Sequence, residues 1–119
     1  AGILAAADFL LPHGNAIHGP DGAMQPSPHG IRLQLARWRA GPGYRGQPIV
    51  YNEDDHFEFD KPDNHFTAAV ESGASWGFFD YRRSRERFEE GFQSLPVDWT
   101  ISSARKRGFF GLLKEITGA

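Results

Sequence analysis

A dense group of polar side chains follows a short apolar run near the middle of the chain. Residues 48–51 lead directly into Asn52, Glu53, Asp54, Asp55 and His56. A carboxylate that neighbouring donors keep ionised can act as a nucleophile or as a general acid/base. We therefore take Glu53 as the candidate catalytic residue, and we expect Asn52 beside it to contribute a hydrogen bond to the site.

Two further apolar runs, residues 7–11 and 74–79, also lead into polar residues. All three runs are short and do not alternate with polar residues, which is typical of strands buried on both faces in a parallel sheet. The carboxyl ends of parallel strands meet at one edge of the sheet, where ligands bind in such folds. We therefore expect one substrate site with Glu53 that also includes His13, Asn15, Asp80 and Tyr81.

Metal chemistry is the alternative at the same edge. His13 and Asp80 would come from strand ends, and imidazole and carboxylate groups bind catalytic metals in hydrolases. Residues 54–56 are consecutive and cannot all face one ligand, so alternate residues among them should point outward into solvent. We expect no metal and no other cofactor, and keep a metal-dependent hydrolase as the alternative.

Aromatic residues are numerous for a chain of this length, with ten Phe, three Trp and three Tyr in 119 residues. Some of these rings fill the core, and the remainder are candidates for a binding surface. Trp76 lies near the carboxyl end of the third run, where it is either a core residue or an apolar platform for a sugar ring. Trp99 lies in an expected loop, where an exposed ring would help to hold a substrate.

Composition indicates one domain over residues 1–119. Thirteen Lys and Arg against fifteen Asp and Glu give a formal charge of -2, so a protein that binds nucleic acid or anionic lipid through bulk charge is excluded. The absence of cysteine excludes disulfides and cysteine nucleophiles. No stretch is long and apolar enough to span a bilayer. From this and from the charge balance, we expect neither a membrane nor a nucleic acid as a partner.

Helical patterns follow each of the three apolar runs. Ile31, Leu35 and Trp38 share one face of a helix that residues 41–43 end, while Pro26 and Pro28 indicate a loop over residues 24–30. A second helix is capped by Asp63 or Asn64 and ends at Gly73. A third helix is capped by Ser102 or Ser103 and ends at Gly118. The expected fold is α/β, with three parallel βα units and long loops.

Four segments resemble the last part of bacterial glycoside-hydrolase-like (β/α)8 barrel proteins, and the resemblance runs from Asp8 to Gly118. They are PIVYNEDDHF at 48–57, ASWGFFDYR at 74–82, SLPVDW at 94–99 and SARKRGFF at 103–110. The resemblance implies the sixth, seventh and eighth βα units of a TIM barrel and O-glycosyl hydrolysis of a carbohydrate. It implies that Glu53 is the nucleophile at the seventh strand, or the acid/base if the register differs, and that Trp76 contacts the sugar.

The partner carboxylate of such enzymes lies on the fourth strand, which this chain does not contain. Hydrolysis by two carboxylates needs both groups, about 5 Å apart for retention. A whole barrel needs roughly 250 residues. We therefore expect a fragment of a longer parent that is inactive without its N-terminal half and associates with that half or with itself. The remaining alternative is a non-catalytic carbohydrate-binding or structural fragment.

Overall fold

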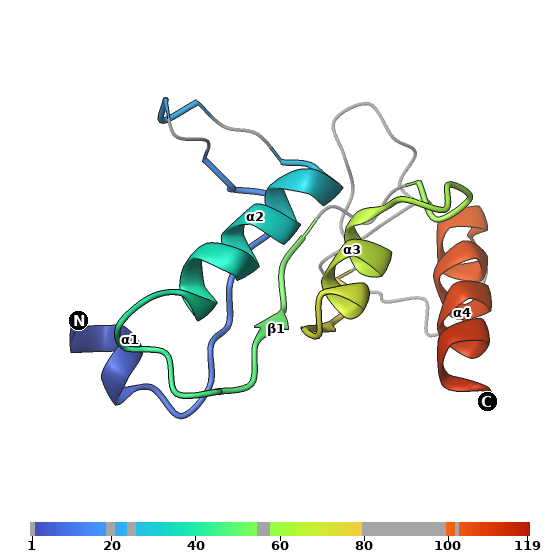
Figure 1. The fold of residues 1–119 in the computed structure, drawn as a ribbon. Coiled ribbons are helices and arrows are strands. Elements are labelled where there is room, and N and C mark those ends of the chain that lie inside the picture. The colour runs from blue at the N-terminus through green and yellow to red at the C-terminus, as the bar shows by residue number, and fades with distance from the viewer. Residues whose placement is uncertain (1, 19–20, 24–25, 55–57, 80–99, 102) are drawn as a thin grey trace.

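The structure of this chain is a computed structural model that describes residues 2–18, 21–23, 26–54, 58–79, 100–101 and 103–119. The described residues form four helices and one small sheet. The helices are α1 (Gly2–Ala6), α2 (Pro28–Arg39), α3 (His65–Glu71) and α4 (Ala104–Thr117), and the strands are β1 (Val50–Tyr51) and β2 (Ser75–Trp76). In Figure 1, α3 lies between α2 and α4, with the two termini at opposite sides of the view.

The two strands run parallel, with Val50 paired to Ser75 and Tyr51 to Trp76. The backbone amide of Ser75 donates to the carbonyl of Ile49 at 2.8 Å, and the amide of Gly77 donates to the carbonyl of Tyr51 at 2.8 Å. The first apolar run touches this sheet through an isolated parallel bridge between Leu10 and Ile49. The parallel direction expected for these segments is therefore observed.

The expectation of three βα units from a (β/α)8 barrel is wrong. The described residues contain a two-stranded parallel sheet, and residues 7–11 form no strand. Each strand is two residues long, because the pairing is limited to the carbonyls and amides of residues 49–51 and 75–77. Pro48 has no amide to donate to the ladder, although its carbonyl accepts from the amide of Leu10 at 2.9 Å.

The helices end where their cap residues predict, with one correction. Asn64 and Ser103 accept hydrogen bonds from the third helical amide of α3 and α4, and Gly118 closes α4 in the left-handed region at φ 71°. The loop expected over residues 24–30 is wrong at its end, because α2 begins at Pro28 behind its N-cap Ser27. Proline is well tolerated at this first helical position, where its missing amide has no partner within the helix.

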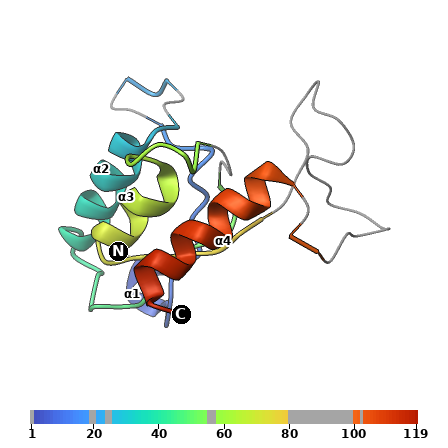
Figure 2. The same cartoon turned by 90° about the vertical axis from the view of Figure 1, so that its right-hand side faces the viewer.

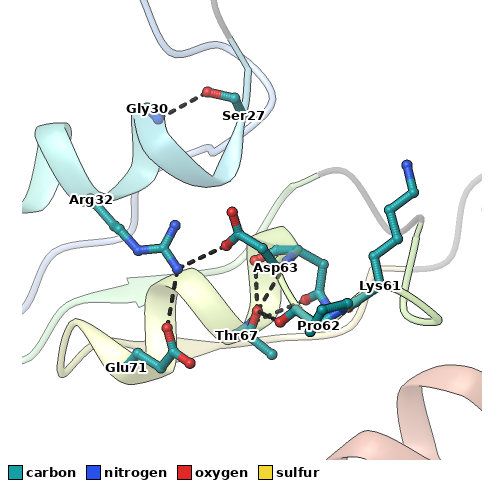
Figure 3. Close-up of polar contacts among 9 residues, drawn as sticks. Ser27, Gly30, Arg32, Lys61, Pro62, Asp63, Thr67 and Glu71 are labelled. Atoms are coloured by element: carbon teal, nitrogen blue, oxygen red, sulfur yellow. Dashed lines mark hydrogen bonds and ion pairs between the residues drawn. The ribbon is translucent and has the colours of Figure 1, made fainter.

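Two arginines of α2 hold it against α3. Arg32 donates to Asp63 at 2.8 Å and to Glu71 at 3.1 Å, so its guanidinium joins the residues before and at the end of α3, as Figure 3 shows. Arg39 donates to the carbonyl of Gly73 at 2.9 Å and also to that of Ser72, just after α3. The contacts of Arg32 and Arg39 therefore connect α2 to α3, the helix that carries His65 of the candidate site.

The core lies between the sheet and the helices and is largely aromatic on the side of α4. Trp76 of β2 meets Phe66 of α3 and Phe109 of α4 at ring-centroid distances of 5.3 and 5.7 Å. Phe109 is the buried residue of α4, which crosses in front of the other elements in Figure 2. Among the described residues, none of the helices has both the length and the apolar character needed to cross a lipid bilayer.

Candidate functional site

The carboxyl end of β1 brings Glu53 and His13 together. Their backbones form an isolated parallel bridge, in which the amide of Gly14 donates to the carbonyl of Glu53 at 3.0 Å. Glu53 Oε2 lies 3.7 Å from His13 Nδ1, with 38% and 47% of the two side chains exposed. These two groups are therefore close to one another and open to solvent, as a pair that meets a substrate must be.

The next residue, Asp54, is in the opposite environment, because its side chain is fully buried. Its Oδ1 lies 2.6 Å from His65 Nδ1, and its Oδ2 accepts from Trp76 Nε1 at 2.8 Å. Gly14 covers the carboxylate so closely that a Cβ at that position would lie 2.2 Å from Asp54 Oδ1. Four segments of the chain thus converge on one buried carboxylate.

This buried network is the part of the site that the sequence does not predict. Nothing in the spacing distinguishes Asp54 from Asp55 and His56, which lie outside the described residues. His65 opens α3 and is eleven positions from its partner, so no local pattern links the two. The one available signal was Gly14, since a glycine directly after His13 permits the close approach that the carboxylate needs.

The carboxylate of Asp54 orients the ring of His65. With Trp76 Nε1–H on one oxygen, the other oxygen is the acceptor for a proton on His65 Nδ1, which places the ring's lone pair on Nε2. His65 is only 11% exposed. The Asp54–His65 pair therefore resembles the carboxylate–histidine pairs in which the carboxylate orients the imidazole. The same contacts connect α3 to the end of β1.

Burial also affects Tyr51, which precedes this edge. The desolvation of its phenol and, to a smaller extent, the negative charge of Asp54 raise the pKa of Tyr51 well above its ordinary value, while Arg39 opposes the shift. The hydroxyl donates to Gln34 Oε1 on α2 at 2.5 Å. Tyr51 is therefore a protonated donor that anchors β1 to α2, and its hydroxyl takes no part in proton transfer near neutral pH.

The other predicted site residues fall into three groups. Asn52 is exposed beside Glu53, and Asn15 is half-buried two residues after His13. Trp76 is buried, with its indole N–H bonded to Asp54 and its ring among three phenylalanines, Phe59, Phe66 and Phe109. Asp80, Tyr81 and Trp99 lie outside the described residues.

The described edge offers one partly exposed imidazole–carboxylate pair beside one buried pair. Within the described part of the chain, no group of three or more His, Cys, Asp or Glu residues is placed to hold a metal ion. Comparisons of this chain with protein-family models, curated proteins and solved structures found no match.

Proposed function

We propose that this chain binds and hydrolyses a carbohydrate at the carboxyl end of β1, with Glu53 as the working carboxylate and with His13 in place of the second carboxylate whose absence led us to expect an inactive fragment. The observation that supports the proposal is the His13–Glu53 pair, which is fixed at the backbone and open at the side chains. A carboxylate in this position can meet a ligand without first being uncovered. The resemblance of residues 48–57 to glycoside-hydrolase-like proteins supplies the expected substrate class.

The two side chains can share the proton transfers of glycoside hydrolysis. Cleavage breaks the bond between the anomeric carbon and the leaving oxygen, which then takes up a proton. As the base, Glu53 removes a proton from a water whose oxygen bonds to the anomeric carbon while His13 gives its proton to the leaving oxygen, and the proton on Glu53 then passes to His13 and restores both groups. As the nucleophile, Glu53 bonds to the anomeric carbon while His13 protonates the leaving oxygen, and a water that gives its proton back to His13 then hydrolyses the glycosyl ester and releases Glu53. The two groups lie 3.7 Å apart without a ligand, so they must separate to about 5 Å or more for a glycosidic bond to enter between them.

Asp54 and Trp76 position the backbone next to Glu53. The buried carboxylate is bonded on both oxygens, so it holds the chain directly after Glu53 in one conformation. The Asp54 side chain is fully buried, so it cannot reach a substrate. We therefore assign positioning to Asp54 and chemistry to Glu53.

The substitution Glu53→Gln tests the proposal because it keeps the shape of the side chain and removes its charge. We expect hydrolysis of a panel of aryl glycosides to fall by at least about 100-fold, with sugar binding retained. Glu115→Gln is the matched control, since Glu115 is exposed on α4. Equal turnover by wild type and Glu53→Gln would remove Glu53 from the mechanism.

Sugar binding without cleavage is the second function, and one observation favours it. Of the described carboxylates at this edge, Asp54 is buried and fully bonded, so Glu53 lacks a second exposed carboxylate beside it. Two-carboxylate hydrolysis requires that partner. If binding of glycans is measured together with absent turnover of every aryl glycoside, the binding function replaces the hydrolytic one.

A further inference from the structure

The buried carboxylate of Asp54 contacts both of the segments that carry the His13–Glu53 pair. Asp54 directly follows Glu53, and Gly14, which directly follows His13, lies against the carboxylate. The three atoms nearest to a Cβ on Gly14 would all belong to the Asp54 carboxyl group, at 2.2, 2.3 and 2.4 Å. The amide of Gly14 also donates to the carbonyl of Glu53 at 3.0 Å. One carboxylate therefore touches the backbone next to each member of the pair.

His65 holds this carboxylate from a helix end that is itself fixed. Its Nδ1 lies 2.6 Å from Asp54 Oδ1, and its side chain is 11% exposed. The preceding residue, Asn64, is buried and begins α3 with a capping box that includes Thr67. Arg32 connects both ends of this helix to α2. Because the start of α3 is fixed in this way, the imidazole gives Asp54 a defined position relative to the helix.

The two oxygens of Asp54 meet donors on different elements. His65 opens α3, whereas Trp76, whose indole N–H donates to Oδ2 at 2.8 Å, lies in β2. Hydrogen bonds have preferred directions, so two donors on separate elements fix the orientation of the carboxylate as well as its place. Apolar packing joins segments without the cost of burying a charge, and often as stably. Control of orientation therefore accounts for a carboxylate at this position better than stability does.

We propose that His65 and Gly14 are positioning residues, which act through Asp54 to set the backbone positions of His13 and Glu53. His65 orients the carboxylate, and Gly14 permits the close approach at which its own amide bonds to the carbonyl of Glu53. The exposed side chains of the pair can still turn apart to admit a substrate while their backbones stay in register. The catalytic part of this inference rests on the function proposed above, and the structural part does not.

The first test measures hydrogen exchange at the Gly14 amide in the full chain labelled with ¹⁵N, because this amide joins the two segments. His65→Leu keeps a side chain of similar size and removes the donor to Asp54. We expect the Gly14 amide to exchange at least about tenfold faster, with the protection of α2 and α4 unchanged. His65→Asn should restore most of the protection, since its side-chain amide nitrogen can take the place of Nδ1. His29→Leu is the matched control, because His29 is exposed on α2.

Equal exchange at Gly14 in wild type and His65→Leu overturns the role of His65, and so does a loss of protection that His65→Asn does not reverse. An equal loss of protection in α2, α3 and α4 also overturns it, because that result shows a role in stability alone. If His65→Leu does not fold, His65→Gln takes its place, since its amide nitrogen lies one bond further from the backbone than that of asparagine.

A double-mutant cycle tests Gly14 independently of His65. Gly14→Ala places a methyl group on the Asp54 carboxylate and should lower the protection factor of the amide at position 14 by at least about tenfold. In the Asp54→Ala background the same substitution should have little further effect, because the atoms that the methyl group meets are gone. Equal effects of Gly14→Ala in the two backgrounds overturn the role of Gly14.

Turnover of aryl glycosides separates this inference from the proposed function. If wild type hydrolyses a glycoside, His65→Leu should lower kcat by at least about tenfold and change KM by less than about twofold, because a misplaced pair impairs the reaction more than binding. His65→Asn should recover most of the lost kcat. An unchanged kcat in His65→Leu overturns the catalytic part of the inference. No turnover by wild type rejects hydrolysis, and the exchange at Gly14 then decides the positioning role by itself.

Discussion

At the scale of single residues, two adjacent carboxylates lie in opposite surroundings. Glu53 is partly exposed and lies beside a partly exposed imidazole, so its side chain is open to solvent. Asp54 is fully buried and has donors on both oxygens, which offset the cost of removing a charge from water. Loss of either donor would leave an uncompensated buried acceptor, which costs far more than loss of an exposed contact.

The phenol of Tyr51, which lies beside this buried carboxylate, makes the stability of the folded chain depend on pH in the alkaline range. Because burial raises its pKa above the ordinary value of 10.0, the folded chain holds the phenolic proton more tightly than the unfolded chain. This contribution to stability is fully present below the ordinary pKa and is lost as the pH rises from there toward the raised pKa. The folded state should therefore weaken in alkali.

Tyr51→Phe should make the stability of the chain less sensitive to alkaline pH. At neutral pH the variant loses the hydrogen bond to Gln34, which costs about 1 kcal/mol. Above pH 10 the wild type loses stability through titration of Tyr51 and the variant does not, so their urea midpoints should converge. If the difference between the two midpoints is the same at pH 7 and above pH 10, the raised pKa of Tyr51 has no part in stability.

At the scale of elements, the boundaries of α3 depend on one buried cap more than on its surface ion pairs. The side chain of Asn64 accepts from the amide of Thr67 at 3.0 Å, and its own amide nitrogen donates to the carbonyl of Lys61 at 2.9 Å. The hydroxyl of Thr67 accepts from the amide of Asn64 at 3.0 Å, which completes a capping box. Arg32 joins α2 to α3 through carboxylates that are mostly exposed.

The buried cap at Asn64 and the exposed ion pairs of Arg32 should therefore differ in their effect on stability. Asn64→Ala should lower the free energy of unfolding by about 1–2 kcal/mol, since it removes a cap and leaves buried groups without a partner. Arg32→Ala should lower it by less than about 1 kcal/mol, because exposed ion pairs are weak. Urea unfolding measures both, with Arg37→Ala as the control for loss of an exposed charge from α2. A larger loss from Arg32→Ala would reverse this ranking.

Local signals predicted α2, α3 and α4, apart from the start of α2, but they predicted neither α1 nor the length of the strands. Caps such as Asn64 and Gly118 act within one turn of the chain, so their residue types are enough to place a helix end. A strand depends on a partner that is distant in sequence, and residues 7–11 contact the sheet through a single bridge. Their apolar composition indicated a strand, but the pairing that would complete it is absent among the described residues.

The candidate site was predicted only in part, because most of its contacts join residues that are distant in sequence. The rule that ligands gather at the carboxyl end of parallel strands placed His13 near Glu53, and the structure brings the two together. The partners of Asp54 lie at positions 14, 65 and 76, and their convergence is a property of tertiary packing.

At the scale of the whole molecule, α4 is joined to the other elements through an aromatic cluster around Phe109, with Leu112 and Leu113 also packed against the core. Phe109 is the buried residue of this helix, and its ring contacts Phe66, Trp76 and Phe78 at centroid distances of 5.3, 5.7 and 4.7 Å. Gly108 adds a close backbone approach to Phe59. The aromatic cluster therefore connects α3, β2 and α4.

Phe109→Ala should release α4 while leaving the contact between α2 and α3 in place. Removing a large buried ring costs about 3–5 kcal/mol, and among its described residues α4 has no other buried side chain to hold it in place. Amide hydrogen exchange should show protection in α4 reduced by about 100-fold or more, with much smaller changes in α2 and α3, which Arg32 and Arg39 hold together. Ile116→Ala is the control, because Ile116 is 42% exposed on the same helix. An equal loss of protection in all three helices would show that the chain unfolds as one unit and that α4 is not a separable element.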